Sequence, residues 1–331
     1  MQDSELSFKK SFRDICNGYC KIKSSLGDFF IKHLNYEDLA DLDDLRSDYY
    51  QSAKKMGLPT IEESIENLHE EGSWTEKEEK SLTEKEVYVV RLNDSKKKLY
   101  LKSQIDKRNE EIEKVKAEIF DLKNKRNSLI GANCEDYADQ KLTEEFIRKS
   151  FYKNEDFKSL AFEEEEFYEL DPSDISELVK VYSNSSDSVS DLRIQKLVLC
   201  DFFSYYMPFC EDPMQFYGKP IINLTHNQIK LILYARYFQN IFTNSDKIPE
   251  EYKKDPEKIM EFVNAKENSK KVIKERDGNS ASSIVGAQAS DYEYLDLNDN
   301  KNTKTVNLSE EAKKKGGALN MQDLMKMMGE E

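Results

Sequence analysis

The residues best suited to metal binding or nucleophilic chemistry are few and widely spaced. Cys16 and Cys20 lie four positions apart, but no second pair of cysteines or histidines accompanies them. A structural zinc site needs such a second pair, so we interpret both cysteines as small apolar side chains on one buried helical face. His33, His69 and His226 are isolated. His226 falls in the first turn of an expected helix, where a structural polar role is favoured over catalysis.

Motifs for binding phosphate or calcium are absent or incomplete. Neither G-x-x-x-x-G-K-[ST] nor G-x-G-x-x-G occurs in the sequence, which disfavours the common nucleotide sites. Residues 296–300 are similar to the start of a calcium loop, but Lys301 replaces the turn glycine and Asn307 replaces the bidentate glutamate. We therefore expect no catalytic residue, no cofactor and no metal.

The charge of the chain argues against two classes of partner. Lys and Arg number 50 and Asp and Glu number 65, giving a formal net charge of −15. Such an excess repels nucleic-acid backbones and anionic lipid surfaces. The most compact basic runs, at 96–98 and 313–315, lack interleaved stacking aromatics. No apolar stretch approaches the ~20 residues that span a bilayer, so we expect neither nucleic acid nor membrane as partner.

Two further features indicate a cytoplasmic protein. The first residues are polar and lack the apolar run of a signal peptide. The five cysteines are an odd number at irregular spacing, which favours reduced thiols over a disulfide framework.

Helix start and stop signals recur along the first half of the chain. Asn35 precedes an apolar stripe of three- and four-residue spacing, and Gly57 follows that stripe. Thr60 with Glu63 forms a capping box that begins the next helix. A later helix, over about 134–151, is expected to return antiparallel against the long helix before it.

The second half contains another set of boundaries. A helix is predicted to begin at Pro172, and the Ser-rich stretch 183–190 is predicted to be a loop. The apolar region that begins at Leu192 predicts a helix buried on most sides and ending before Pro208. Thr225 with Gln228 forms a further capping box.

Residues 99–130 show the seven-residue spacing typical of a coiled coil. Arg108 and Arg126 fall at seam positions, where they either set register or mark a fraying helix, and fraying is favoured. The seam is predicted to bind a partner helix, within the chain or on another chain. Its apolar residues are Ile105, Ile112, Val115, Ile119 and Leu122.

The C-terminal region combines a polar linker with a short apolar stripe. Residues 270–307 contain few large apolar side chains, which predicts a disordered linker. After it, side chains at i, i+3, i+4 and i+7 predict a short Met-rich helix that docks on a partner. The predicted docking residues are Leu319, Met321, Leu324, Met325 and Met328.

These patterns predict a mainly α protein. We expect a helical bundle with a central coiled-coil segment, a second small helical domain and a disordered C-terminal tail. The expected domains are residues 1–155, including the coiled-coil segment 99–130, then 156–265, and a flexible tail 266–331 with a terminal helix.

Three short segments of the sequence resemble proteins encoded among the virion-assembly genes of large tailed bacteriophages. They cover a modest fraction of the chain and carry no catalytic residues. The segments are residues 126–147, with Leu129-Ile130-Gly131 and Glu135-Asp136-Tyr137-Ala138; residues 216–241, with Phe216-Tyr217-Gly218-Lys219-Pro220 and Leu224-Thr225; and Leu319-Asn320-Met321-Gln322-Asp323-Leu324-Met325. The resemblance implies a tail or baseplate assembly factor, such as a chaperone that escorts a long helical tail protein.

We therefore expect a non-enzymatic assembly protein, either a phage tail or virion assembly chaperone or a minor structural component. It would act in the host cytoplasm or in the virion. The expected partners are other proteins, among them a helical tail or baseplate protein and further copies of this chain. The alternative is a regulatory adaptor that binds host or viral machinery through the same elements.

Overall fold

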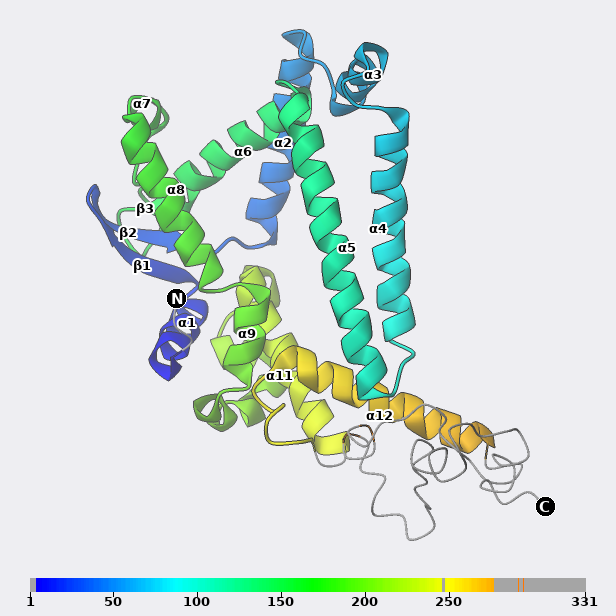
Figure 1. Cartoon of the computed structure of the whole chain (residues 1–331). Helices are drawn as coiled ribbons and strands as arrows, with labels where there is room; N and C mark the ends of the chain where they lie inside the picture. The colour runs from blue at the N-terminus through cyan, green and yellow to red at the C-terminus, as the bar shows by residue number, and fades with distance from the viewer. Residues whose placement is uncertain (1–3, 246–247, 277–290, 292–293, 295–331) are drawn as a thin grey trace, which may run out of the picture. The chain divides into compact units, whose positions relative to one another are not determined.

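The structure is a computed structural model of the 331-residue chain and describes residues 4–245, 248–276, 291 and 294 (Figure 1). It is mainly α-helical, as predicted, and it also contains a small antiparallel sheet that the sequence did not lead us to expect. None of the helices in this described part is long and apolar enough to cross a membrane.

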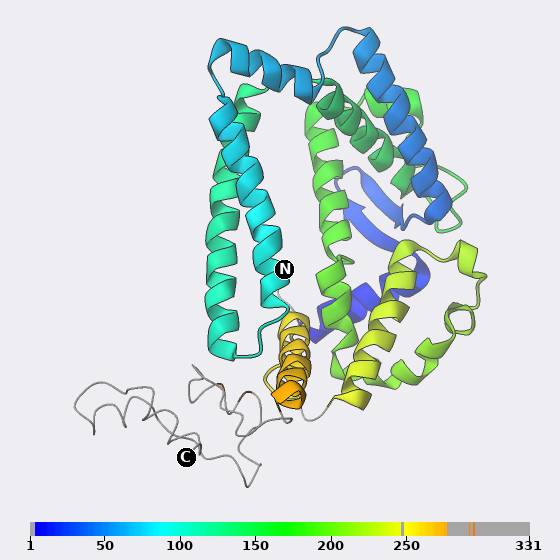
Figure 2. The same ribbon diagram turned by 90° about the vertical axis from the view of Figure 1, so that its right-hand side faces the viewer.

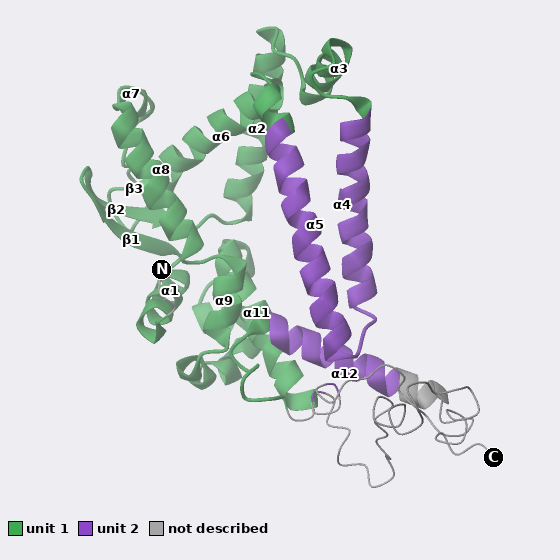
Figure 3. Ribbon diagram, viewed as in Figure 1, with its two compact units in different colours: residues 1–76, 126–256 green, residues 77–125, 257–331 purple. Residues whose placement is uncertain are grey.

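The chain divides into two compact units (Figure 3). Unit 1 comprises Met1–Glu76 and Arg126–Pro256, and unit 2 comprises Lys77–Lys125 and Glu257–Glu331. This division differs from the consecutive domains expected from the sequence. Most of a long helical hairpin belongs to unit 2, whereas the residues before and after it in the sequence belong to unit 1. Helix α12 (Pro256–Arg276) also continues well past residue 266, where the flexible tail was expected to begin.

Unit 1 contains most of the helices. Their bounds are α1 (Glu5–Asn17), α2 (Tyr36–Lys55), α3 (Ile61–Glu71), α6 (Cys134–Ser150), α7 (Glu164–Tyr168), α8 (Pro172–Asp187), α9 (Asp191–Val198), α10 (Pro213–Tyr217) and α11 (His226–Asn244), with 3₁₀ turns at η1 (Asp201–Tyr205), η2 (Met207–Glu211) and η3 (Ile221–Asn223).

The predicted helix caps are present. Asn35, Thr60 and Thr225 each accept a hydrogen bond from the backbone N–H three residues on, and the side chain at that third position bonds back to the cap backbone. These reciprocal bonds satisfy amides that a helix start leaves free. Gly57, with φ of 84°, follows α2 in the left-handed conformation that glycine adopts without strain.

The sheet has the order β1–β2–β3 and is antiparallel throughout. Strands β1 (Tyr19–Ser24) and β2 (Gly27–Lys32) form a tight hairpin, and the two-residue strand β3 (Phe151–Tyr152) pairs with β2. Cys20 lies opposite Ile31 in β2. The expectation that Cys16 and Cys20 share a helical face is therefore wrong, because Gly18 ends α1 between them.

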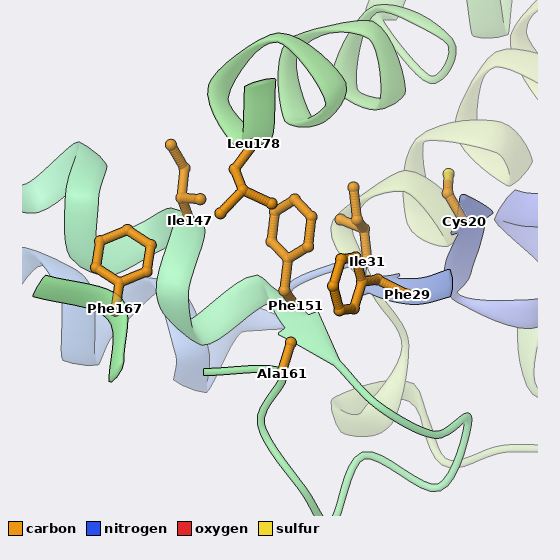
Figure 4. Close-up of a cluster of buried hydrophobic side chains, with 8 residues drawn as sticks. All are labelled: Cys20, Phe29, Ile31, Ile147, Phe151, Ala161, Phe167 and Leu178. Carbon is orange, nitrogen blue, oxygen red and sulfur yellow. The ribbon is translucent and has the colours of Figure 1, made fainter. Parts of the chain in front are cut away.

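The core of unit 1 forms where α6, α7 and α8 contribute side chains to one buried cluster with the sheet (Figure 4). Phe29 and Phe151, from neighbouring strands, meet edge to face with ring centroids 5.8 Å apart. Ile147 from α6 and Leu178 from α8 belong to the same cluster. The partner that the structure shows for α6 is α2, which lies alongside it and is joined to it by the Arg46–Asp139 ion pair.

A second group of helices in unit 1 consists of α1, α9 and α11. Arg193 of α9 donates to Ser11 Oγ at 3.1 Å and stacks on the ring of Phe8. Gln228, fully buried in α11, donates from Nε2 to the Cys16 carbonyl at 3.1 Å. These polar links join three segments that are far apart in sequence.

Two local predictions are wrong in this region. The stretch 183–190 is not a loop, since α8 continues to Asp187 and buries Ser185 on its packed side. The predicted long buried helix after Leu192 instead stops at Val198 and continues as the 3₁₀ turns η1 and η2. The apolar residues there are too closely spaced in sequence to lie on one helix face, and several of them are exposed.

Candidate functional site

The predicted partner-binding seam of α5 (Lys102–Leu129) faces another helix of the same chain, α4 (Glu76–Lys96). The two helices run side by side as a hairpin in both Figure 1 and Figure 2. Ile112 and Val115 form a buried cluster with Leu92 of α4, and Val89 and Ile119 pack against that cluster. These seam residues therefore pack against a helix of the same chain.

The other two seam residues differ in exposure. Ile105 is buried and Leu122 is half-buried. Val90 of α4 and Phe120 of α5 are exposed. The apolar cluster covers only part of the four expected heptads, so a coiled coil is not established, and the binding of a partner by these residues stays a prediction.

Charged side chains cross between the two helices of the hairpin. Lys123 Nζ lies 2.6 Å from a carboxylate oxygen of Glu86. Lys85 donates to Glu118, and this hydrogen bond with the lysine charge lowers the pKa of Glu118. Such flanking pairs are the ones that fix which helix face meets which.

Polar groups also join α12 to the hairpin within unit 2. Lys96 Nζ donates to both Asn109 Oδ1 and Glu261 Oε1 at 3.0 Å. Asp291 accepts from the backbone N–H and the hydroxyl of Ser103, each at 2.8 Å, and so caps the start of α5. Asp291 is fully buried although it belongs to the stretch expected to be a linker.

The predicted docking residues at the C-terminus lie outside the described residues. They are Leu319, Met321, Leu324, Met325 and Met328. Their role stays a prediction.

The sequence did not lead us to expect the concentration of exposed apolar side chains between residues 205 and 242. Of 21 large apolar side chains that are exposed in the described part, nine lie in this interval. They are Tyr205, Tyr206, Phe209, Met214, Ile221, Ile222, Leu233, Tyr237 and Phe242. We call them the exposed apolar segment. The high apolar content was visible in the sequence, but it was read as burial.

A cavity of about 400 Å³ is the other feature that sequence reasoning missed. It lies entirely in unit 1, and its lining comes from the end of β2 and the residues after it, from α2, α6 and α8, and from the first residues of α9 and α11. No spacing in the sequence brings these segments together, so no local signal pointed to it.

Two buried groups meet beside this cavity. The Cys20 Sγ lies 3.2 Å from His33 Nε2, and both residues are buried. Burial raises the pKa of the Cys20 thiol to about 11 and lowers the pKa of His33 to about 4. At neutral pH the pair is therefore a thiol and a neutral imidazole, not the thiolate and imidazolium of an activated nucleophile.

Comparisons with models of known protein families, with curated proteins and with solved structures find no significant match. No group of three or more metal-binding side chains occurs within the residues that the structure describes. All five cysteines are free thiols. The surfaces and the cavity are accordingly the features from which function is inferred.

Proposed function

We propose that the chain acts by binding other proteins, as a non-enzymatic assembly factor. The observation that carries the proposal is the exposed apolar segment, with nine large apolar side chains exposed within 38 positions. Single exposed apolar residues are ordinary, whereas a concentration of them is typical of interaction surfaces. Four of the nine are Tyr or Phe on the 3₁₀ turns and α11, and aromatic residues are enriched in interfaces.

The narrower role rests on the three-segment resemblance. It is that of a phage tail or virion assembly chaperone, or of a minor structural component. In either role the hairpin and the C-terminal Met-rich stripe would supply further contacts to other proteins or to a second copy. A regulatory adaptor would use the same surfaces but would co-purify with host or viral machinery instead of with a tail protein or with particles.

The test of the binding surface compares two matched pairs of substitutions. The test pair is Tyr205→Ser with Phe209→Ser, at side chains 79% and 67% exposed. The control pair is Tyr36→Ser with Met56→Ser, at side chains 81% and 67% exposed elsewhere in unit 1. All four changes remove exposed apolar groups, so both double variants should fold normally.

The measurement is quantitative pull-down with cross-linking mass spectrometry, using the full chain in cells that make its partners. We expect the test pair to lose the partner cross-linked near residues 205–242, and the control pair to retain it. Equal recovery by the two double variants would contradict the proposal.

The C-terminal stripe is tested separately by ending the chain after Asn307. Three or four buried Met and Leu side chains would contribute roughly 5–8 kcal/mol before the cost of ordering, which corresponds to micromolar or weaker binding. We expect the shortened chain to fold and to lose the partner that docks there. Undiminished partner recovery would remove the tail from the proposal and leave the exposed apolar segment as the binding surface.

A further inference from the structure

The cavity in unit 1 is bounded by two helix starts. Ser190 and Asp191, at the beginning of α9, line it, as do His226 and Asn227 at the beginning of α11. Helix starts direct free N–H groups and a partial positive charge toward whatever faces them. Two of them on one cavity favour an anionic occupant.

The amides at these two starts are only partly used. His226 N–H donates to the Leu34 carbonyl at 3.3 Å, and Gln228 N–H donates to Thr225 Oγ1. The N–H of Asn227, between them, and that of Asp191 have no acceptor among the residues placed by the structure. At α9 the cap residue Ser190 makes no side-chain capping bond. Donors are thus free on both sides of the cavity.

His33 supplies an independent sign of a ligand. It lines the cavity, it is only 6% exposed, and its Nδ1 has no hydrogen-bond partner within the described structure. A buried polar atom left without a partner is destabilising, because it has lost its hydrogen bonds to water without replacing them. The protonated Cys20 thiol beside Nε2 can donate to that nitrogen, which places the ring proton on Nδ1 as one more donor.

The charged groups of the lining add to this pattern. They are Lys32, Lys230 and a single carboxylate, Asp191. Lys230 Nζ lies 2.5 Å from Asp191 Oδ1, while Lys32 is held by Asp38 from outside the lining at 2.8 Å. Each of the two lysines is therefore already paired with one carboxylate, and Asp191 occupies the place where a ligand anion would meet Lys230.

The rest of the lining is mainly apolar. It consists of Ile31, Leu34, Leu39, Phe146, Tyr182 and Val189, together with Ser185 and Ser186 of α8. A mainly apolar wall with a few convergent polar groups is the usual composition of a small-molecule site, and the volume is within the usual range.

We propose that this cavity binds a small organic anion, a molecule in which one carboxylate or phosphate group is attached to an apolar body. The anionic group lies at Lys230 and the free amides of Asp191 and Asn227. The apolar body lies against Phe146 and Tyr182. This site is separate from the protein-binding surface proposed above, and its ligand would add small-molecule control or stabilisation to unit 1.

The test uses four probes on the full chain by isothermal titration calorimetry. Phenyl phosphate and benzoate combine an anion with a ring, benzyl alcohol keeps the ring without the charge, and inorganic phosphate keeps the charge without the ring. We expect phenyl phosphate or benzoate to bind at least about tenfold more tightly than benzyl alcohol and inorganic phosphate. Binding of only one of the two identifies the anionic group, and binding of neither overturns the proposal.

Two substitutions of opposite expected sign sharpen the test. Lys230→Gln should weaken binding by about tenfold, and Asp191→Asn should tighten it several-fold by removing the competing carboxylate. Lys253→Gln is the matched control, since it breaks an ion pair of the same 2.5 Å separation, with Glu250, outside the cavity lining. A purely structural role for the pair would leave affinity unchanged or change it in the same direction in both variants, and that result would overturn the proposal.

A measurement on the unaltered protein covers the case in which a variant fails to fold. The ring ¹⁵N resonances of His33 should shift when the better probe saturates the site, because His33 lines the cavity and its surroundings change when the cavity is filled. No shift of His33 at saturation would show that the probe does not reach this cavity.

Discussion

The core of unit 1 and the hairpin of unit 2 bury apolar side chains in two different ways. The unit 1 cluster draws on residues from Cys20 to Leu178 and includes four fully or almost fully buried large side chains, Phe151, Phe167, Ile147 and Leu178. The hairpin cluster lies between residues 89 and 119, is wholly aliphatic, and leaves Ile119 half-buried.

The difference shows what each arrangement requires. The hairpin needs only a local pattern and a turn, because its two helices are consecutive in the sequence. The unit 1 core exists only after the β1–β2 hairpin, β3 and α8 have come together, since each contributes one or a few residues to it. Substitutions in unit 1 should therefore be felt throughout that unit, and those in the hairpin should act locally.

The largest expected effect is that of Phe151→Ala. This side chain is completely buried at the junction of β2, β3 and the helices, so its truncation should cost about 3–5 kcal/mol of unfolding free energy. Urea unfolding followed by the fluorescence of Trp74, the single tryptophan and itself in unit 1, measures this. Phe209→Ala, at an exposed position, is the control and should cost under about 0.5 kcal/mol. A cost for Phe151→Ala as small as that of the control would contradict the view that the unit 1 core depends on this side chain.

The next largest effect is a dependence of the stability of unit 1 on pH. Because burial lowers the pKa of His33 from 6.5 to about 4, the unfolded chain takes up a proton between these pH values while the folded chain does not. The stabilisation is thus fully present above pH 6.5 and is lost as the pH falls toward 4, on the order of 3 kcal/mol in all. His33→Phe should remove this slope from urea unfolding curves recorded across that range.

The hairpin provides the contrast for the same measurement. The three histidines are at positions 33, 69 and 226, so unit 2 contains none. Amide exchange of α4 and α5, corrected for the intrinsic rate, should show no histidine-dependent change over this range and no response to His33→Phe. A response of the hairpin equal to that of unit 1 would mean that the two units unfold as one.

A smaller and more local effect is expected for Ile112→Ala. The residue is buried in the hairpin seam, but the half-buried Ile119 lies beside it and can partly fill the space. We expect a cost of about 2 kcal/mol, at the low end for such a truncation. Hydrogen exchange should show the loss in α4 and α5. Phe120→Ala, at a side chain 65% exposed on the same helix, should leave exchange in α4 and α5 almost unchanged.

The smallest effect is that of the ion pairs between the hairpin helices. Lys123→Ala breaks the contact with Glu86, and exposed pairs of this kind contribute under about 1 kcal/mol. The loss should shrink further in about 1 M salt, where screening acts over roughly 3 Å. Lys116→Ala breaks a pair within α5 itself, and a loss of the same size there would show that the cross-helix pairs add nothing to helix pairing.

Local chemistry made the helix starts predictable, whereas the sheet and the cavity were not. A capping residue and its partner three positions on act within one turn, so Asn35, Thr60 and Thr225 were identified correctly. Strands β1 and β2 are six residues each and pair with each other across a tight hairpin, but the third strand, with Phe151, is two residues long and lies far along the chain. A short alternation of apolar and polar residues is weak evidence for a strand by itself.

The exposed apolar segment was misread for a related reason. Apolar density in a sequence indicates burial only when the backbone can turn those side chains to one side. In this segment, two 3₁₀ turns follow α9 and separate buried Phe203 and Cys210 from exposed Tyr205 and Phe209. The sequence could not show which of these side chains would be covered.

The sequence by itself determined the mainly helical class, the places where helices begin, the acidic surface and the long helix that carries the seven-residue pattern, because these depend on neighbours within one or two turns. Only the tertiary structure decided that this seam packs on α4, that Cys20 is on a strand beside His33, and that two helix starts share one cavity. The first two depend on how neighbouring segments fold back on one another, and the third depends on contacts between residues far apart in the chain. None of them follows from the pattern within a single helix or strand, because they are fixed by packing.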